Sequence, residues 1–113
     1  MLFLLSRLVD IDMRLYRTRA FPPLYESGVR YIPEVTGVVT TQPVEDWQAI
    51  DVLYATKRGD CEDLACARVA ELRVQGYDAH PRITKQGRVW HVTVRCGDQV
   101  EDPSKLLGMK GTA

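Results

Sequence analysis

The sequence has no excess of either charge. Its 113 residues include 15 basic and 15 acidic side chains, so the formal net charge at pH 7 is zero. Proteins that bind nucleic acids or membrane surfaces through bulk charge carry a clear positive excess. We therefore expect neither nucleic acid nor a membrane as a partner.

A long apolar run is also missing. Residues 1–5 are apolar, but acids follow at Asp10 and Asp12 and no small-residue cleavage site is present, unlike in a signal peptide. No stretch approaches the roughly 18 apolar residues that a membrane span needs. The expected location is the cytoplasm.

Cysteine is scarce, and the three residues Cys61, Cys66 and Cys96 cannot all pair within the chain. Their spacing matches no disulfide framework, which favours free thiols in a reducing compartment. Neither Cys-x-x-Cys nor His-x-x-x-His occurs, so we expect no zinc and no cofactor. Cys66 and Cys96 lie in apolar runs and are expected in the core.

The remaining cysteine, Cys61, follows a glycine turn and opens an apolar-periodic segment. Asp60 is suited to cap a helix, and Asp63 lies three residues on, close to a capping-box pattern. A thiol at a helix N-terminus faces free N–H groups and the positive end of the helix dipole, which favour the thiolate. This pattern predicts a reactive cysteine.

The elements around this turn predict an α+β fold in one domain spanning residues 1–113. Helices are expected over 43–54 and 61–75, the second ending at Gly76, and strands over 79–84, 88–95 and 99–101. Helix and strand patterns compete over residues 1–20 and are left open. The core is expected at 44–113, preceded by an N-terminal segment and a proline-rich arm at 1–43. The aromatic residues expected to pin this arm are Phe21, Tyr25 and Tyr31.

Within the helix of 61–75, the apolar residues form one stripe and the polar residues the opposite, wet side. The stripe comprises Cys61, Ala65, Val69 and Leu72, and the wet side comprises Glu62, Glu71, Arg73 and Gln75.

One histidine and one carboxylate complete a possible catalytic set. On the strand 88–95, His91 lies on the face opposite Val92 and Val94. The next strand ends at Glu101 and Asp102, of which only one can serve His91, since they point to opposite faces. The hypothesis is a triad with Cys61 as nucleophile, His91 as base and Asp102 as the acid that orients it.

Four segments together resemble the core of the transglutaminase-like superfamily: Gly59-Asp60-Cys61, residues 72–79, His91-Val92 and Asp102-Pro103. The resemblance covers residues 58–105, a little under half of the chain. It implies a papain-like fold, with a cysteine-bearing helix packed on a small antiparallel sheet, and the same three catalytic roles. Residues 23–30, taken with this core, resemble the short phage or prophage members, which would make a virion the other possible location.

The chain also departs from the family pattern. Glu62 stands where larger enzymes have tryptophan, and Thr93 stands where many members have an aromatic residue. The upstream side-chain donor of the oxyanion hole is not identifiable; the candidates are Gln42, Trp47 and Gln48.

Three functions stay open at this point. The leading hypothesis is thiol-dependent amide hydrolysis or acyl transfer on a protein or peptide, with hydrolysis preferred to cross-linking. The second is a non-catalytic structural or assembly protein, such as a virion component, whose partners dock on the arm. The third is a thiol redox sensor.

Overall fold

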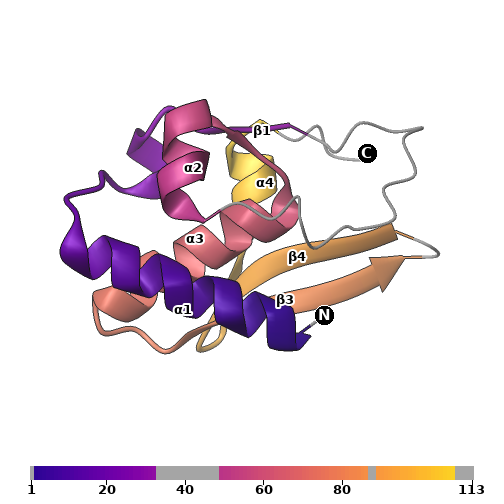
Figure 1. Ribbon diagram of the computed structural model, residues 1–113. Helices are drawn as coiled ribbons and strands as arrows, with labels where there is room; N and C mark the ends of the chain where they lie inside the picture. The colour runs from indigo at the N-terminus through magenta and orange to yellow at the C-terminus, as the bar shows by residue number, and fades with distance from the viewer. Residues whose placement is uncertain (1, 33–48, 87–88, 109–113) are drawn as a thin grey trace.

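The computed structural model describes residues 2–32, 49–86 and 89–108. Its helices and small antiparallel sheet confirm the α+β class (Figure 1). The elements are α1 (Leu2–Thr18), the 3-10 helix η1 (Leu24–Glu26), β1 (Arg30–Tyr31), α2 (Ile50–Thr56), β2 (Arg58–Gly59), α3 (Cys61–Val74), β3 (Ala79–Gln86), β4 (Val89–Cys96), β5 (Gln99–Glu101) and α4 (Pro103–Leu106).

The N-terminal ambiguity resolves as a helix, because α1 packs along α3. Leu5, Leu8 and Val9 recur at helical spacing and are buried. Asp12 continues the same face and is fully buried. Of the residues whose alternation suggested a strand, Ile11 is exposed on the outer side of α1, whereas Val9 is buried and Met13 and Leu15 pack partly buried against the core. The N-terminal segment thus belongs to the same core as the rest of the domain.

Helix α3 lies at the centre, between α1 and the sheet (Figure 1). Its start is the expected capping box: the Asp60 carboxylate accepts from the Asp63 N–H at 3.2 Å, and the Asp63 carboxylate accepts from the Asp60 N–H at 3.3 Å. Its end is fixed by Gly76, whose φ of 98° suits glycine. Both predicted ends of the helix are confirmed.

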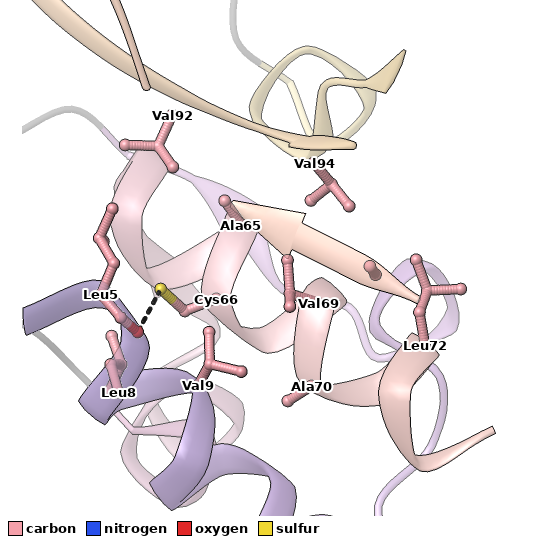
Figure 2. Packing of buried hydrophobic residues seen from close by; sticks show 11 residues of the cluster. Leu5, Leu8, Val9, Ala65, Cys66, Val69, Ala70, Leu72, Val92 and Val94 are labelled. Carbon is pink, nitrogen blue, oxygen red and sulfur yellow. Dashed lines mark hydrogen bonds between the residues drawn. The ribbon is translucent and has the colours of Figure 1, made fainter. Parts of the chain in front are cut away.

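Figure 2 shows how the two faces of α3 are filled. Cys66 and Val69 meet Leu5 and Val9 of α1, and Ala65 lies below Val92 of β4. Cys66 is buried, with its sulfur 3.7 Å from the Leu5 carbonyl oxygen, as expected of a core cysteine. Cys96 is partly buried and packs against the same cluster.

The prediction that Glu71 lies on a wet side of α3 is wrong. Only 5% of its surface is exposed, because the arm crosses this part of the helix. The Leu24 N–H donates to Glu71 Oε2 at 3.2 Å, and Arg68 contacts Glu71 Oε1 at 2.8 Å. Helix α3 is therefore buried on more sides than its sequence pattern indicates.

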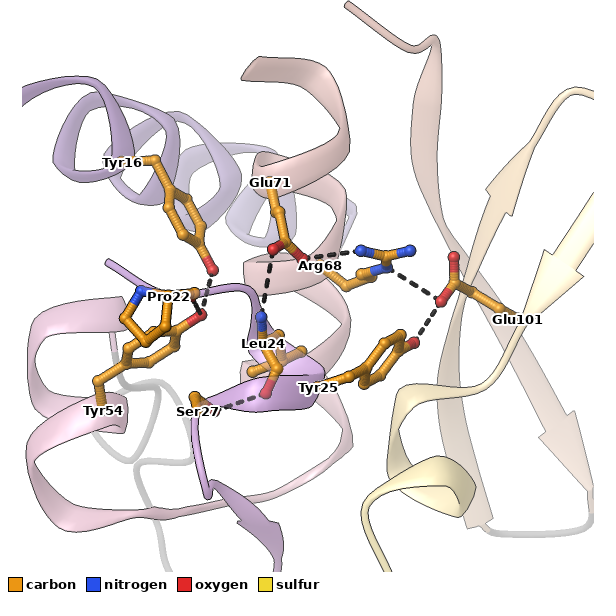
Figure 3. A network of polar contacts seen from close by, with 9 residues as sticks. All are labelled: Tyr16, Pro22, Leu24, Tyr25, Ser27, Tyr54, Arg68, Glu71 and Glu101. Atoms are coloured by element: carbon orange, nitrogen blue, oxygen red, sulfur yellow. Dashed lines mark hydrogen bonds and ion pairs between the residues drawn. The ribbon is translucent and has the colours of Figure 1, made fainter. Parts of the chain in front are cut away.

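The arm is held by a polar cluster that we call the Arg68 cluster: Tyr25, Arg68, Glu71 and Glu101 (Figure 3). Arg68 Nε lies 3.0 Å from Glu101 Oε2, and the Tyr25 hydroxyl donates to the same oxygen. The guanidinium also lies over the Tyr25 ring, 4.7 Å from its centroid. The expectation that Tyr25 pins the arm is confirmed.

A second group of aromatic residues anchors the beginning of the arm. The Phe21 ring packs edge-on against the rings of Tyr16 and Tyr54, at 5.9 and 5.2 Å between centroids. The Tyr54 hydroxyl donates to the Pro22 carbonyl at 2.9 Å (Figure 3). These contacts join α1, α2 and the arm.

The sheet has the order β3–β4–β5, and every pair is antiparallel. Alternation points Val92 and Val94 toward α3, whereas His91, Thr93 and Arg95 belong to the other face, here called the outer face. The expected turn after Gln86 and the start of the helix expected at 43 lie outside the described residues; the described part of that helix, α2, begins at Ile50.

Four short elements were not predicted: η1, β1, β2 and α4. Strand β1 pairs in parallel with β2, so that Tyr31 faces Gly59. Helix α4 begins at Pro103 with Asp102 as its N-cap, whose Oδ1 accepts from the Lys105 N–H at 3.3 Å. Aspartate followed by proline is a known helix-start signal, so this helix was open to prediction.

Candidate functional site

Cys61 is the first residue of α3, directly after the Asp60 cap. The approach to it is tight: a Cβ on Gly59 would lie 2.4 Å from Leu53 Cδ1 and 3.2 Å from Asp63 Cβ. Since Leu53 is fully buried, it has little space to retreat. Glycine at position 59 is thus what lets the chain enter the helix at this place.

His91 and Asp102 form a direct pair. His91 Nε2 lies 2.7 Å from Asp102 Oδ2, with 22% and 20% of the two side chains exposed. Because a carboxylate accepts, the neutral ring carries its proton on Nε2 and keeps the Nδ1 lone pair as a base. Glu101 points to the other face and joins the Arg68 cluster instead. Of the two neighbouring acids, Asp102 is the one that reaches His91.

The Cys61 thiol lies beside the same strand without a hydrogen bond to His91 in the described part of the chain. The backbone N–H of Val92, one residue from His91, favours the Cys61 thiolate and so lies close to the sulfur. Helix α3 packs on the Val92 face of β4, whereas His91 belongs to the outer face. The structure thus joins two of the three predicted site residues and places the third next to Val92, the strand neighbour of His91.

The electrostatic environment of Cys61 disfavours the thiolate that the sequence predicts. Burial, followed by the negative charge of Glu62, raises the pKa of Cys61 to about 12, and Asp60 adds to the rise. The Val92 N–H offsets only part of this effect. Burial, together with the carboxylates in the first turn of α3, outweighs the helix dipole. At neutral pH Cys61 is a thiol in this structure.

The cap residue is affected in the same direction. Burial raises the pKa of Asp60, and the carboxylates of Glu62 and Asp63 raise it further, since like charges disfavour ionisation. The α3 N-terminus is therefore a crowded acidic environment around one sulfur.

Tyr31 is a neighbour of the site that the sequence did not reveal. Burial raises the pKa of its half-buried hydroxyl, and negative charge on Cys61, Asp60 and Asp102 raises it further. Its position follows from the parallel pairing of β1 with β2, which no local pattern announces. The arm thus reaches the Cys61 end of α3 as well as its middle.

The proposed oxyanion donors Gln42, Trp47 and Gln48 lie outside the described residues. Within the described ranges, no group of three or more His, Cys, Asp or Glu side chains is arranged to hold a metal ion. In the same ranges, none of the helices has the length and apolar character to span a membrane.

Comparison of the chain with protein-family models, with curated proteins and with solved structures found no match in any of the three.

Proposed function

We propose that this protein carries out thiol-dependent acyl chemistry on an amide, with Cys61 as nucleophile, His91 as base and Asp102 as its orienting partner. The observation that carries the proposal is the His91–Asp102 pair at 2.7 Å, next to the strand residue whose N–H faces the Cys61 sulfur. A carboxylate on Nε2 fixes the ring and stabilises the imidazolium that forms when Nδ1 takes a proton.

The chemical steps follow from these atoms. As the sulfur attacks the amide carbonyl carbon, the Cys61 proton passes to His91 Nδ1 and the carbonyl π electrons move to oxygen. When the intermediate collapses, the carbon–nitrogen bond breaks, the imidazolium protonates the leaving amine and a thioester remains. Water then attacks the thioester with His91 as base, which releases the acid and restores the thiol. Peptide or isopeptide hydrolysis is preferred to cross-linking.

The raised pKa of Cys61 adds a condition to this mechanism. A resting thiol must lose its proton during the attack, and the sulfur must first move toward Nδ1. Substrate binding that covers Glu62 with a donor or cation would lower the pKa of Cys61. The site is accordingly one that activates its nucleophile on binding substrate.

The test has two parts, both read by mass spectrometry. The first measures how alkylation of Cys61 by iodoacetamide depends on pH. The second measures acylation of Cys61 by a peptide thioester, which serves as a trapping substrate. The variants are His91→Ala and Asp102→Asn, and Cys66 and Cys96 are internal references in the same molecule. We expect acylation of Cys61 by the thioester in the wild type and at least about a hundredfold slower acylation in His91→Ala. Equal acylation of Cys61 in both proteins would refute the proposed role of His91.

A non-catalytic assembly role is the second candidate, and one observation favours it. The thiol has a pKa raised to about 12 and no hydrogen bond to His91 among the described residues. In this case the arm is the docking element, the expected partners are structural proteins, and virion association is the corresponding location. Absence of any acyl adduct on Cys61, with the His91–Asp102 pair intact by NMR, would favour this second function.

A further inference from the structure

The outer face of the sheet carries a pocket away from Cys61. Its volume is about 350 Å³, and its lining residues are Asp78, His80, Pro81, Arg82, Arg95 and Gly97. His80 pairs directly with Arg95 across β3 and β4, and Arg82 follows two residues along β3 on the same face. Two arginines from neighbouring strands therefore line one hollow.

Neither arginine has an acidic partner among the described residues. In the part of the chain that the structure describes, Arg82 makes no side-chain hydrogen bond or ion pair, and Arg95 donates only to the Gly97 carbonyl at 3.2 Å. This differs from Arg68, whose guanidinium contacts two carboxylates. The Arg82 and Arg95 guanidinium groups thus have donors to spare for a ligand.

His80 is occupied and does not compete for that ligand. Arg73 Nη2 lies 3.2 Å from His80 Nδ1, and Asp78 Oδ1 lies 2.8 Å from His80 Nε2. Since a guanidinium only donates and a carboxylate only accepts, these contacts require the neutral ring with its proton on Nε2. Arg73 also donates to the Ala79 carbonyl at 2.7 Å, which fixes it at the rim.

The charges then select the ligand. Among the described residues around the pocket, Arg73, Arg82 and Arg95 face a single carboxylate, that of Asp78, which leaves an excess of two positive charges without counting His80. A phosphomonoester carries between about −1.5 and −2 at pH 7 and offers three acceptor oxygens, whereas a carboxylate carries −1. Guanidinium forks match phosphate oxygens in geometry as well as in charge.

We propose that this pocket binds the phosphate group of a small phosphomonoester, with Arg82 and Arg95 as the two ligand-binding side chains. The site is independent of Cys61 and of the proposed acyl chemistry.

The experiment is a ¹⁵N NMR titration of the whole chain at pH 7 and constant ionic strength. The probes are inorganic phosphate, phenyl phosphate and, as a carboxylate of similar shape, benzoate. We expect saturable shifts at the Arg82 and Arg95 side-chain Nε–H and at the Gly97 amide. Phenyl phosphate should bind more tightly than benzoate, and tighter binding of inorganic phosphate than of phenyl phosphate would show that the free ion is the ligand and overturn the phosphomonoester class.

Arg82→Gln and Arg95→Gln should each weaken phenyl phosphate binding at least about tenfold, the loss of one charge-assisted contact. Arg14→Gln, at an exposed position of α1, is the matched control and should leave binding unchanged. All three changes lie at exposed positions, and the amide spectrum verifies the fold. Absence of saturable shifts, equal loss in Arg14→Gln, or benzoate binding as tightly as phenyl phosphate would each overturn the proposal.

Discussion

The middle and the N-terminal end of α3 differ in the environment of their acidic side chains. In the middle, Glu71 and the neighbouring Glu101 share one guanidinium, that of Arg68. At the N-terminal end, Asp60 and Glu62 flank a thiol, and both Asp60 and Cys61 have raised pKa values. One helix thus contains a structural cluster whose two carboxylates contact a guanidinium and, three turns away or less, a site whose neighbouring acids raise the pKa of a thiol. The contrast separates the part that holds the fold from the part available for chemistry.

The strongest way to break the contrast is to remove the shared cation. Arg68→Met leaves Glu71 buried and Glu101 half-buried without their cationic partner. It also leaves the Tyr25 hydroxyl as the remaining partner of the Glu101 oxygen that Arg68 contacts. Because Arg68 itself is partly exposed, we expect a loss of about 2–3 kcal/mol in the free energy of unfolding, below the full value for a buried pair. Urea denaturation measures it, with Arg14→Met as control. A loss as small as that of the control would mean that the cluster contributes no net stability.

The next test concerns Asp12, which is buried near the Cys61 end of α3 with no cationic partner among the described residues. Its Oδ1 accepts from the Ile50 N–H at 2.9 Å, while its Oδ2 is buried with no hydrogen bond to any described residue. Burial, partly offset by this backbone bond, raises the pKa of Asp12 to about 8. Below this value the folded state holds a proton that the unfolded state releases above about pH 4.

Stability should therefore fall as the pH rises from about 4 to about 8, on the order of a few kcal/mol. Asp12→Asn removes this titration and should flatten that part of the pH profile, whereas Asp10→Asn, at an exposed position of the same helix, should not. Urea midpoints between pH 4 and pH 9 measure the difference. Parallel profiles for the wild type and Asp12→Asn would contradict the raised pKa.

A smaller effect is expected when the charge next to Cys61 is removed. Glu62→Gln removes the charge that, after burial, contributes most to the raised pKa of Cys61. The pKa should fall, and alkylation of Cys61 at pH 8 should become several-fold faster, because the thiolate is the nucleophile. Mass spectrometry compares it with Asp98→Asn, an exposed acid in the β4–β5 turn. An unchanged rate would mean that the charge of Glu62 does not contribute to the raised pKa of Cys61.

The smallest effect separates the two roles of Asp102, which caps α4 and contacts His91. Asp102→Ala removes the cap and should cost about 1 kcal/mol of stability, whereas Asp102→Asn keeps a capping oxygen and should cost less. Thermal unfolding monitored by circular dichroism measures both. Equal losses would mean that the carboxylate acts in the fold through its charge rather than as a cap.

Local signals made much of this fold predictable. Asp60 and Asp63 predicted the start of α3, and Gly76 predicted its end. The alternation of residues in β4 predicted the two faces of the sheet. These features depend on residues a few positions apart. The class of fold followed from their order along the chain.

Long-range contacts were not predictable in this way. Tyr25 meets Glu101 across 76 residues, and the pairing of β1 with β2 has no pattern of its own. Hence the burial of Glu71 and the approach of Tyr31 to the site were both missed.

For the candidate site, the sequence already indicated that His91 and the Cys61 helix lie on different faces of β4. Alternation assigned His91 to the face opposite Val92 and Val94, and it is those valines that pack on the Cys61 helix. The pairing of His91 with Asp102 was predictable from the tight turn that joins β4 to β5, because Asp102 directly follows β5. The face of β4 on which the Cys61 thiol lies depends on how α3 packs against the sheet. Residue spacing in the sequence does not predict this packing.

The packing of α1 on α3 has a consequence for the newly made chain. Leu5 and Cys66, which meet in the core, are separated by 61 residues. During synthesis, α1 therefore leaves the ribosome long before the helix that buries its apolar face exists, at typical rates by several seconds. By contrast, β3 and β4 can pair as soon as both have emerged. The first helix to be made must thus wait for α3 to emerge before its apolar face can be buried.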